Sequence, residues 1–529
     1  MGEGKFLVAG MLAVALACGS SQQANAQPKP QPGGTAVFTL TQDPPNVNPD
    51  VTTGLANRQI GCVLLDGLVD LSNDYRILPA LAKSWTISPD GLTYSFELEK
   101  TKWHDGKPFT AEDVRYSLVE VAAKYSAVFG PAGRLIQTVD TSQPDKVVIK
   151  LSQPFGPFLV SLTCPQGSAI LPSHLFQGTN PLQNPFNTQS PVGTGPFKLV
   201  EWKRGQYIRM EKNRDYRIPG KPLLDELVAK IISQPAAAVQ ALQAGEVDAV
   251  QSVQASYVAT VKADPKLKVE TSDIAPLTTM AFLNVKRKPL DDMRVRQALY
   301  MALDREYIFK NAFFGLGAVA VAPWTTEIKW AVNPEIDLRK QYPFDVAKAN
   351  ALLDEAGVKR GADGKRFALK FVIYNSEYPE FVQVSSAMKS MWGAVGVDVD
   401  IESMETATLI KRVFEAHDFD VVVQSYSSYG DPSLGIARSF ISSSIGKNSG
   451  NAGSYSNAEL DALFAKGEGD SAFEARGKYY KEAAVILARE LPVLPLRQLQ
   501  NNDAATKRLH DVWGTVQGFG TWTHAWLEK

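Results

Sequence analysis

The chain has 529 residues, more than one hydrophobic core usually organises, so two or more lobes are expected from size alone. Hydrophobic residues make up 44% and charged residues 21%, which is enough apolar material for a buried core and argues against disorder. The formal net charge is -1, with acids and bases dispersed along the chain. That balance lacks the clustered Lys and Arg that a nucleic acid backbone requires, so no nucleic acid partner is expected.

The first residues have the pattern of a targeting segment. Lys5 precedes the apolar run 6–17, whose length is typical of a signal peptide and too short for a membrane span. Ala24-Asn25-Ala26 then matches the small-x-small pattern of a cleavage site. We therefore expect a signal peptide over 1–26, cleavage after Ala26 and a mature chain that starts at Gln27 in the periplasm.

Lipid attachment at Cys18 is the competing route of export, because this cysteine ends the apolar run. Leu16 lies one place later than lipoprotein signals prefer, so a soluble periplasmic protein is favoured over a lipid-anchored one. After cleavage, Cys62 and Cys164 are the cysteines that remain. They could form one disulfide in an oxidising compartment or stay as two small buried thiols, and the sequence leaves both open.

Turn residues delimit the first predicted strands. The β-type run 35–40 is followed by Asp43-Pro44-Pro45-Asn46, where the prolines force a loop. The runs 85–88 and 92–98 flank Pro89-Asp90-Gly91, which predicts a β-hairpin. Thr110 with Asp113 three residues later has the pattern of a capped helix start.

Helices and strands alternate through the rest of the chain, which is typical of α/β layers rather than of a helical bundle. In the helix predicted after Asp292, Val295, Ala298 and Leu299 form an apolar face, and Arg294 and Arg296 are expected to lie off it. The predicted helices are 236–244, 293–303, 347–356 and 384–395, and the predicted strands are 247–250, 368–374, 397–401 and 419–423.

Motifs of catalysis were sought and none was found in the sequence, including H-E-x-x-H, G-x-S-x-G, the Walker A loop and C-x-x-C. His104, His174 and His417 have no partner at metal-ligand spacing and are expected in turns or at the surface. No catalytic residue, metal site or cofactor is therefore expected, and the chain is interpreted as a protein without enzymatic activity.

The segment 426–432 (YSSYGDP) is the strongest candidate for contact with a ligand. It follows the apolar strand predicted over 419–423 and places hydroxyl groups where ligands of α/β proteins usually bind. Tyr426, Ser428, Tyr429 and Asp431 are the candidates in this segment, although Asp431 before Pro432 also suits a turn residue bonding its own backbone. Asn46, in the loop after the first strand, is expected to face them from the other lobe.

The chain contains, in this order, the segments 66–69 (DGLV), 78–85 (LPALAKSW), 88–94 (SPDGLTY), 103–114 (WHDGKPFTAEDV), 193–197 (GTGPF), 245–248 (GEVD), Asn284, 294–298 (RVRQA) and 430–432 (GDP). Together they resemble one family from about Gly34 to the C-terminus, the peptide-, nickel- and opine-type extracellular solute-binding proteins of ABC importers (family 5, or cluster C).

The resemblance implies an α/β protein of two lobes, the type II periplasmic binding protein fold, with an extra domain on the first lobe. It assigns the first lobe to 34–68, 192–277 and 491–529, the extra domain to 69–191 and the second lobe to 278–490. The implied function is capture of a peptide or other small organic solute by lobe closure and its delivery to the permease subunits in the membrane, by a monomeric protein.

The sequence departs from the peptide-binding pattern at one position. Peptide-binding members hold the α-ammonium of the ligand with an Asp a few residues before Gly-Asp-Pro, and counting back places Ser428 there. A neutral hydroxyl offers no charge-assisted hydrogen bond to an ammonium, which is worth about 1.5–3 kcal/mol. A blocked or cyclic peptide, a sugar-like compound or an opine-like acid thus becomes as plausible as a free-amine peptide.

Three alternative functions stay open at this point. A chemosensory receptor would bind the same kind of solute, a secreted hydrolase would turn it over, and an envelope chaperone would bind apolar segments weakly and broadly.

Overall fold

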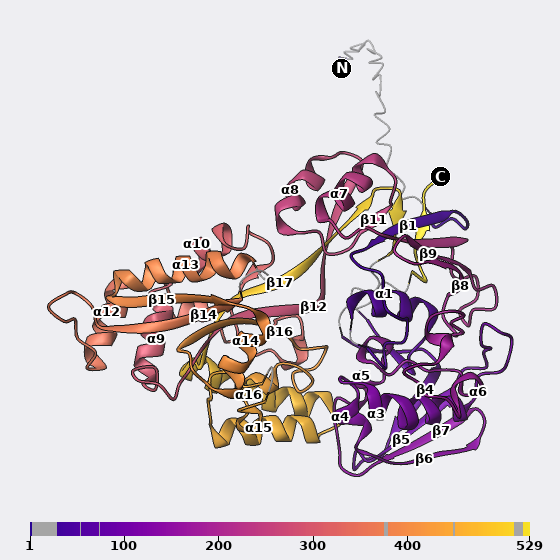
Figure 1. Ribbon diagram of the computed structural model, residues 1–529, viewed down its shortest axis with the longest axis horizontal. Helices are drawn as coiled ribbons and strands as arrows, with labels where there is room; N and C mark the ends of the chain where they lie inside the picture. Colours follow the sequence, from indigo (N-terminus) through magenta and orange to yellow (C-terminus); the bar gives the residue numbers. More distant parts are fainter. Residues whose placement is uncertain (3–28, 53, 73–74, 375–378, 448–449, 513–521) are drawn as a thin grey trace.

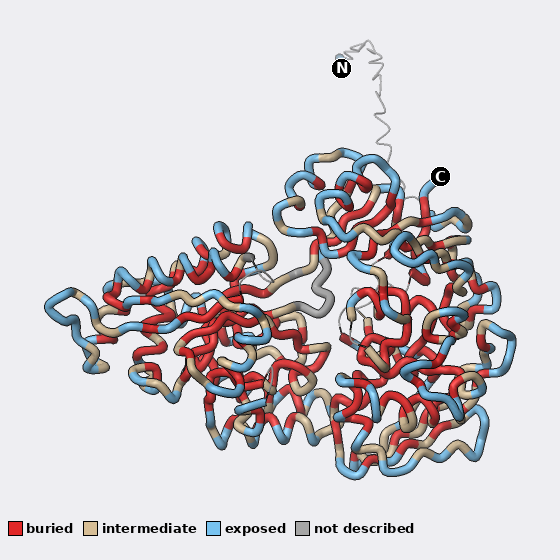
Figure 2. Tube along the Cα trace, viewed as in Figure 1, coloured by how far each residue is buried: buried red, intermediate tan, exposed pale blue. Residues whose placement is uncertain are grey.

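The computed structural model describes residues 1–2, 29–52, 54–72, 75–374, 379–447, 450–512 and 522–529. Almost all of the predicted signal peptide, with Cys18 and the cleavage site after Ala26, lies outside the described residues. The described chain forms two bodies joined by two long strands, β12 (Leu267–Leu283) and β17 (Val493–Thr506) (Figure 1). Figure 2 shows that buried segments fill the interior of each body, so each has a core of its own.

One 11-stranded sheet extends through both bodies because the two long strands pair in each of them. In the body nearer the chain ends, β1 (Thr35–Leu40) pairs in parallel with β10 (Glu226–Ile231) and β11 (Ala249–Val250). The antiparallel strands β9 (Tyr207–Lys212) and β8 (Phe197–Lys203) complete that side. Its helices include α1 (Leu55–Leu64), α7 (Pro235–Ala244) and α8 (Ala255–Ala263).

The predicted β-hairpin belongs to a separate four-stranded antiparallel sheet, and the capped helix lies against this sheet. Its strands, in order, are β4 (Ala82–Ile87), β5 (Thr93–Leu98), β7 (Lys146–Leu151) and β6 (Ile136–Gln143). The hairpin of β4 and β5 is confirmed. Thr110 and Asp113 form the expected capping box of α2 (Ala111–Arg115), and the chain continues in π-helical turns over Tyr116–Ala122. This sheet encloses its own cluster of buried side chains, which includes Phe96 and Phe158.

The His104 side chain forms hydrogen bonds between the unit of this smaller sheet and the segment 193–197 (GTGPF). Its Nε2 lies 3.0 Å from the Gly195 carbonyl oxygen, and the Gly193 N–H donates to its Nδ1 at 3.1 Å. Burial lowers the pKa of His104 to about 4. The ring is therefore neutral at physiological pH and serves the packing of a turn, as expected.

The other body contains β15 (Val397–Met404), β14 (Phe367–Tyr374) and β16 (Val421–Ser427) beside the two long strands. Helices cover both faces of this sheet. Figure 1 shows α10 (Arg305–Asn311) and α13 (Pro379–Ala394) on one face and α15 (Ala458–Gly469) and α16 (Phe473–Glu490) on the other. The predicted helices near 293 and 347 are confirmed as α9 (Met293–Met301) and α12 (Val346–Glu355).

Shorter elements connect these layers. They are β2 (Val69–Leu71), β3 (Ile77–Pro79), α3 (Ala123–Tyr125), α4 (Gly130–Gly133), α5 (Phe158–Ser161), α6 (Ser173–Phe176), β13 (Ala318–Val319), α11 (Leu338–Gln341), α14 (Thr406–Ile410), β18 (Leu509–His510) and β19 (Trp526–Leu527).

Two details of the sequence prediction are wrong. The strand predicted over 419–423 is β16, which starts at Val421 and continues to Ser427, so Tyr426 lies in the strand rather than after it. Arg296 was expected off the apolar face of its helix, yet it is buried. Its guanidinium donates to the carbonyl oxygens of Leu290 and Glu490 at 2.8 and 2.9 Å, so hydrogen bonds compensate for the burial of the charge.

Cys62 and Cys164 form a disulfide. The bond joins α1 to the 3-10 turn Cys164–Gln166, and both cysteines are buried. Of the two alternatives that the sequence left open, the structure shows the cross-link, which closes a segment of 102 residues. In the described ranges no helix has the length and apolar composition of a membrane span.

Candidate ligand-binding site

A cavity of about 390 Å³ lies where the two bodies meet the long strand β17. The loop after β11 and the start of α8 form one side, and the end of α10, the start of α13 and β17 form the rest. The lining residues are Ser252, Val253, Gln254, Ala255, Ser256, Ala312, Phe313, Phe314, Leu316, Glu380, Gln383, Arg497, Leu499, Asn501 and Asn502. We call it the hinge cavity.

The loop after β11 is fixed against β17 by main-chain bonds. The Ser252 N–H donates to Asp503 Oδ1 at 2.8 Å, and the Val253 N–H donates to the Asn502 carbonyl oxygen at 2.8 Å. This loop leaves the carboxyl end of β11, which runs parallel to β1. Ligands of α/β proteins bind preferentially at such strand ends, so the position of the hinge cavity suits a ligand site.

Arg497 of β17 is the charged side chain in the wall of the hinge cavity that is most deeply buried, with 4% of its surface exposed. Its guanidinium lies 3.9 Å from the centre of the Phe313 ring, and its Nη2 lies 3.8 Å from Glu380 Oε1. Burial lowers the pKa of Arg497 to about 10, and the Glu380 carboxylate partly opposes that shift. The side chain remains a cation at neutral pH.

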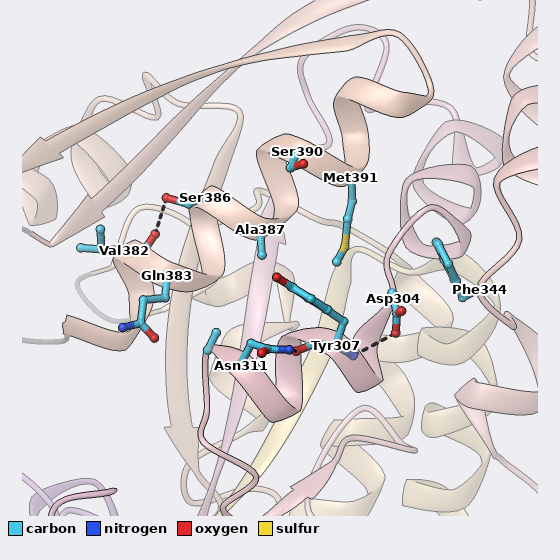
Figure 3. A pocket seen from close by; sticks show the side chains of 11 residues that line it. Asp304, Tyr307, Asn311, Phe344, Val382, Gln383, Ser386, Ala387, Ser390 and Met391 are labelled. Carbon is cyan, nitrogen blue, oxygen red and sulfur yellow. Dashed lines mark hydrogen bonds between the residues drawn. The ribbon is translucent and has the colours of Figure 1, made fainter. Parts of the chain in front are cut away.

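A second cavity, of about 640 Å³, lies between α10 and α13 (Figure 3). Tyr307 and Phe344, each about half exposed, contribute to its wall, and Ser386 donates to the Val382 carbonyl oxygen beside it. Both helices belong to one body. A ligand there could not bridge the two lobes, so the hinge cavity is the better candidate for a site coupled to closure.

Tyr429 lies at a second junction between the bodies, just beyond the end of β16. Its carbonyl oxygen accepts a hydrogen bond from Gln166 Nε2 at 3.0 Å, and Gln166 lies in the body that contains α1. Arg58 of α1 is close enough to interact electrostatically with the Tyr429 phenol, which partly offsets the lowering of the Arg58 pKa by burial. Tyr429 has φ +50°, and its N–H donates to Ser427 Oγ. The segment is therefore held in a tight turn.

Tyr426 and Asp431 do not line the hinge cavity. Tyr426 is 4% exposed, packs on Phe282 at 5.5 Å between ring centres and directs its hydroxyl to the Gly450 carbonyl oxygen. Asp431 is fully buried, lies 2.7 Å from the Arg476 guanidinium and accepts a hydrogen bond from the Ser433 N–H. Both side chains thus serve packing and the turn in this conformation.

Ser428 and Asn46 form hydrogen bonds that hold the loops in which they lie. Ser428 is 3% exposed, and its carbonyl oxygen accepts from the Asp431 N–H at 2.9 Å. Asn46 accepts hydrogen bonds from the Asn48 N–H at 2.9 Å and from Asn57 Nδ2 at 3.1 Å. None of the five residues proposed from the sequence lines the hinge cavity.

The sequence interpretation missed Arg58, Gln166 and Arg497. For Arg497 one signal was available, because it interrupts the apolar run 493–496 of a strand whose neighbours are buried. No sequence pattern could place Gln166 beside Tyr429, since 263 residues separate them. Among the residues that the structure describes, no group of three His, Cys, Asp or Glu side chains could hold a metal ion.

Two α/β lobes, two connecting strands and a cavity with walls from both lobes define a two-lobed binding protein. The chain belongs to the bacterial extracellular solute-binding proteins, family 5, whose model matches residues 76–447. Members of this family are the solute-capturing components of ABC importers. The resemblance stated from the sequence and its fold class are thus confirmed.

Individual relatives match over nearly the whole chain. The oligopeptide-binding protein AppA of Bacillus subtilis is 30% identical over 93% of this chain and 92% of its own. The heme-binding protein A of Haemophilus influenzae is 30% identical over 91% of each chain. The structure of AppA in complex with a nonapeptide has a TM-score of 0.73 and 29% identity, covering 95% of this chain and all of that one.

A further solved structure, the binding protein AgaA of A. tumefaciens R10 in complex with agropinic acid, has a TM-score of 0.74 and 25% identity. It covers 94% of this chain and 99% of that chain. Relatives of one fold are thus named for different ligands, and the fold does not define the ligand of this protein.

Proposed function

We propose that this protein captures a small organic solute between its two lobes in the periplasm and delivers it to the permease subunits of an ABC importer. The observation that carries the proposal is the hinge cavity, because its walls come from both lobes and from the strand that joins them. A ligand in contact with both lobes stabilises the closed form over the open one, and a difference in affinity between two forms is what shifts their populations.

We propose the same division of the chain as the resemblance implies. The first lobe comprises 34–68, 192–277 and 491–529, the extra domain 69–191 and the second lobe 278–490. Separate clusters of buried side chains include Phe38, Phe96 and Phe371, which supports three units, and Tyr116 and Val160 of the extra domain pack into the clusters of the two lobes. The strand β12 crosses from the first lobe to the second, and β17 of the first lobe pairs with it and with β13 of the second lobe, so these strands are the proposed hinge.

The signal-peptide pattern of residues 1–26 supports the periplasmic assignment. We propose that the signal peptide is cleaved after Ala26 and that Cys18 is not lipidated, since a soluble monomer is the form expected from the sequence. Mass spectrometry of the exported protein tests this. A mature N-terminus at Gln27 supports the proposal, and an acylated Cys18 contradicts it.

The ligand is proposed to be a peptide, an opine-like acid or another organic solute. AppA is named for oligopeptides, and AgaA is described with agropinic acid. Ser428 weakens the case for free-amine peptides here, because it is neutral where peptide-binding members have an Asp. A thermal-shift screen of peptides, opines, sugars and nickel chelates identifies the class, since a ligand at 100 times its Kd stabilises by about 2.7 kcal/mol.

The same screen separates the alternative functions. We expect one-to-one binding of one ligand class without turnover, measured by calorimetry and by analysis of the recovered ligand. Turnover of the bound compound would identify a hydrolase, and weak binding of many unrelated apolar peptides would identify a chaperone. Either result would contradict the proposed role.

Ser428 offers a direct test of the peptide question. We expect Ser428→Asp to raise the affinity for a free-amine tetrapeptide about 10- to 100-fold over its N-acetylated form, because the carboxylate restores a charge-assisted hydrogen bond to the ammonium. Ser428→Asn is the control of similar size without charge. If the aspartate variant gains no preference in calorimetry, the ligand is not a free-amine peptide bound in the usual orientation.

A further inference from the structure

We infer that the hinge cavity is a carboxylate-binding subsite in which Arg497 binds the acidic group of the solute. The substrate would then be an organic acid, or a peptide with a free C-terminal carboxylate, rather than a neutral sugar. The inference rests on the proposed solute-capture function and specifies the chemical class of its ligand.

The hydrogen bonding of Arg497 differs from that of the other buried arginines. Four arginines are buried in the described part of the chain: Arg296, Arg305, Arg476 and Arg497. Each of the first three donates at least two hydrogen bonds to carbonyl or carboxylate oxygens. Within the described residues Arg497 donates none, and its Nε is buried without a partner. A buried cation with unused donors is unfavourable unless a partner is supplied, and the cavity beside it has room for one.

The nearest carboxylate does not supply these hydrogen bonds. Glu380 Oε1 lies 3.8 Å from Arg497 Nη2, which is beyond hydrogen-bond distance, and the Glu380 side chain is 28% exposed. Phe313 covers one face of the guanidinium. Because the N–H groups of a guanidinium point outward in its plane, this stacking leaves them available at the edge, in the geometry that binds a carboxylate by two parallel hydrogen bonds.

The start of α8 brings a second source of positive potential to the same cavity. Gln254, Ala255 and Ser256 line the cavity, and they are the N-cap and first two residues of this nine-residue helix. The side chain of the N-cap residue Gln254 makes no capping hydrogen bond, so it does not satisfy the first N–H groups of the helix. Such a helix terminus favours an anion, and it comes from the first lobe, whereas Phe313 and Glu380 beside Arg497 come from the second. An oxyanion between the two would therefore hold the lobes together.

The charges around the cavity favour a singly charged group. Arg497 and Glu380 nearly cancel each other, and the helix terminus adds about half a positive charge. This leaves enough positive potential for one carboxylate and too little for a phosphate dianion. Asp503 also lies behind the loop, where its carboxylate accepts the Ser252 N–H.

The test compares Arg497→Met with the wild type in calorimetry, using matched probes. The probes are tetra-alanine, its C-terminal amide, agropinic acid, maltose and inorganic phosphate. We expect the wild type to bind one or both of the carboxylate probes and to prefer tetra-alanine over its amide if the peptide binds. We expect Arg497→Met to weaken binding of the carboxylate probes about 10- to 100-fold, the range of two charge-assisted hydrogen bonds.

The unfolding temperature of the ligand-free protein gives a readout that a purely structural arginine would not give. Arg497→Met should not lower it, because the variant removes a buried charge that makes no hydrogen bond to the described residues. Arg476→Met is the matched control, a buried arginine with hydrogen bonds, and it should lower the unfolding temperature by several degrees. A loss of stability in Arg497→Met as large as in Arg476→Met would overturn the inference.

The remaining outcomes separate the inference from the proposed function. Tightest binding of the amide or maltose, carboxylate binding unchanged in Arg497→Met, or phosphate as the tightest probe would each overturn the carboxylate subsite and leave solute capture intact. If the wild type binds none of the probes and no compound in the broader screen, solute capture itself is contradicted and the subsite with it.

Discussion

Buried polar side chains near the lobe junctions serve different purposes, and their partners distinguish them. Asp431 has a guanidinium and a backbone N–H as partners, which makes it part of the turn that the Asp-Pro sequence suggested. Among the described residues, Arg497 has no hydrogen-bond acceptor for its guanidinium. A sequence shows which residues carry charge, but only the packed structure shows which of those charges are satisfied. For that reason Asp431 was interpretable beforehand and Arg497 was not.

Tyr429 is the residue of the predicted segment that lies at a junction between the lobes. We expect Tyr429→Ala to weaken binding of the solute identified by the screen about tenfold, by roughly 1–2 kcal/mol, because the second lobe loses the side chain that interacts with Arg58 of the first. The hydrogen bond from Gln166 is accepted by the backbone carbonyl oxygen of residue 429, so it should remain in the variant. Tyr429→Phe, which loses only the hydroxyl, is the control. Equal affinity of all three proteins in calorimetry would remove this residue from the site.

Asp50 should give the stability of the protein a specific pH dependence. Burial raises its pKa to about 8, although the Ala169 N–H donates to Oδ1, and within the described part of the chain Oδ2 is buried without a partner. The folded state thus binds a proton that the unfolded state releases near pH 4, so this group's contribution to stability is lost as pH rises toward 8.

We expect Asp50→Asn to become more stable relative to wild type as pH rises from 4 to 8, by up to about 1.4 kcal/mol per pH unit. The asparagine keeps an acceptor for Ala169 and carries no charge. Urea unfolding at pH 5 and pH 8 measures the difference. A difference that is the same at both pH values would contradict the assignment of the titration to Asp50.

At the scale of elements, local signals predicted local structure well. Pro89-Asp90-Gly91 predicted the β4–β5 hairpin because its turn chemistry lies within three residues. β16 was predicted too short because its last residues, Gln424 to Ser427, are polar or aromatic. They extend the strand through pairing with β12, from Leu277 to Met280, and that partner lies more than 140 residues away.

The disulfide connects two elements that are far apart in the chain. We expect Cys164→Ser to lower the free energy of unfolding by about 2–5 kcal/mol, because the unfolded chain regains the freedom of a loop of 102 residues. Solute affinity should stay the same, since neither cysteine lines the hinge cavity. Urea unfolding with and without reductant measures the effect. A change of affinity without a loss of stability would show that the bond shapes the site instead.

At the scale of the molecule, the arrangement of the lobes was available from the family resemblance and not from the patterns alone. The hinge needs β17 to pair with β12 along one edge and with β11 and β13 along the other. These partners come from three distant parts of the chain, and no local period encodes their order. The hinge cavity lies between them, so its position could not be predicted before the fold was known.

The lobes also touch away from the hinge, where the segment before α5 meets the loop between α15 and α16. The Gly156 N–H donates to the Glu468 carbonyl oxygen at 2.7 Å. A Cβ at Gly156 would lie 2.1 Å from the Asp470 carbonyl oxygen and 2.5 Å from Arg476 Nε. Both atoms belong to the second lobe. Because one is backbone and the other a buried, bonded side chain, the clash is relieved most easily by separating the lobes.

We therefore expect Gly156→Ala to enlarge the radius of gyration of the protein in X-ray scattering and to weaken solute binding about tenfold, because closure must overcome the clash. Each lobe should keep its own stability, since the new methyl group enters neither core. Gly393→Ala is the matched control, because that glycine lies in α13 with no atom within 4 Å of an added Cβ. If Gly156→Ala scatters and binds as Gly393→Ala does, this contact has no part in closure, and the hinge strands alone determine how the lobes meet.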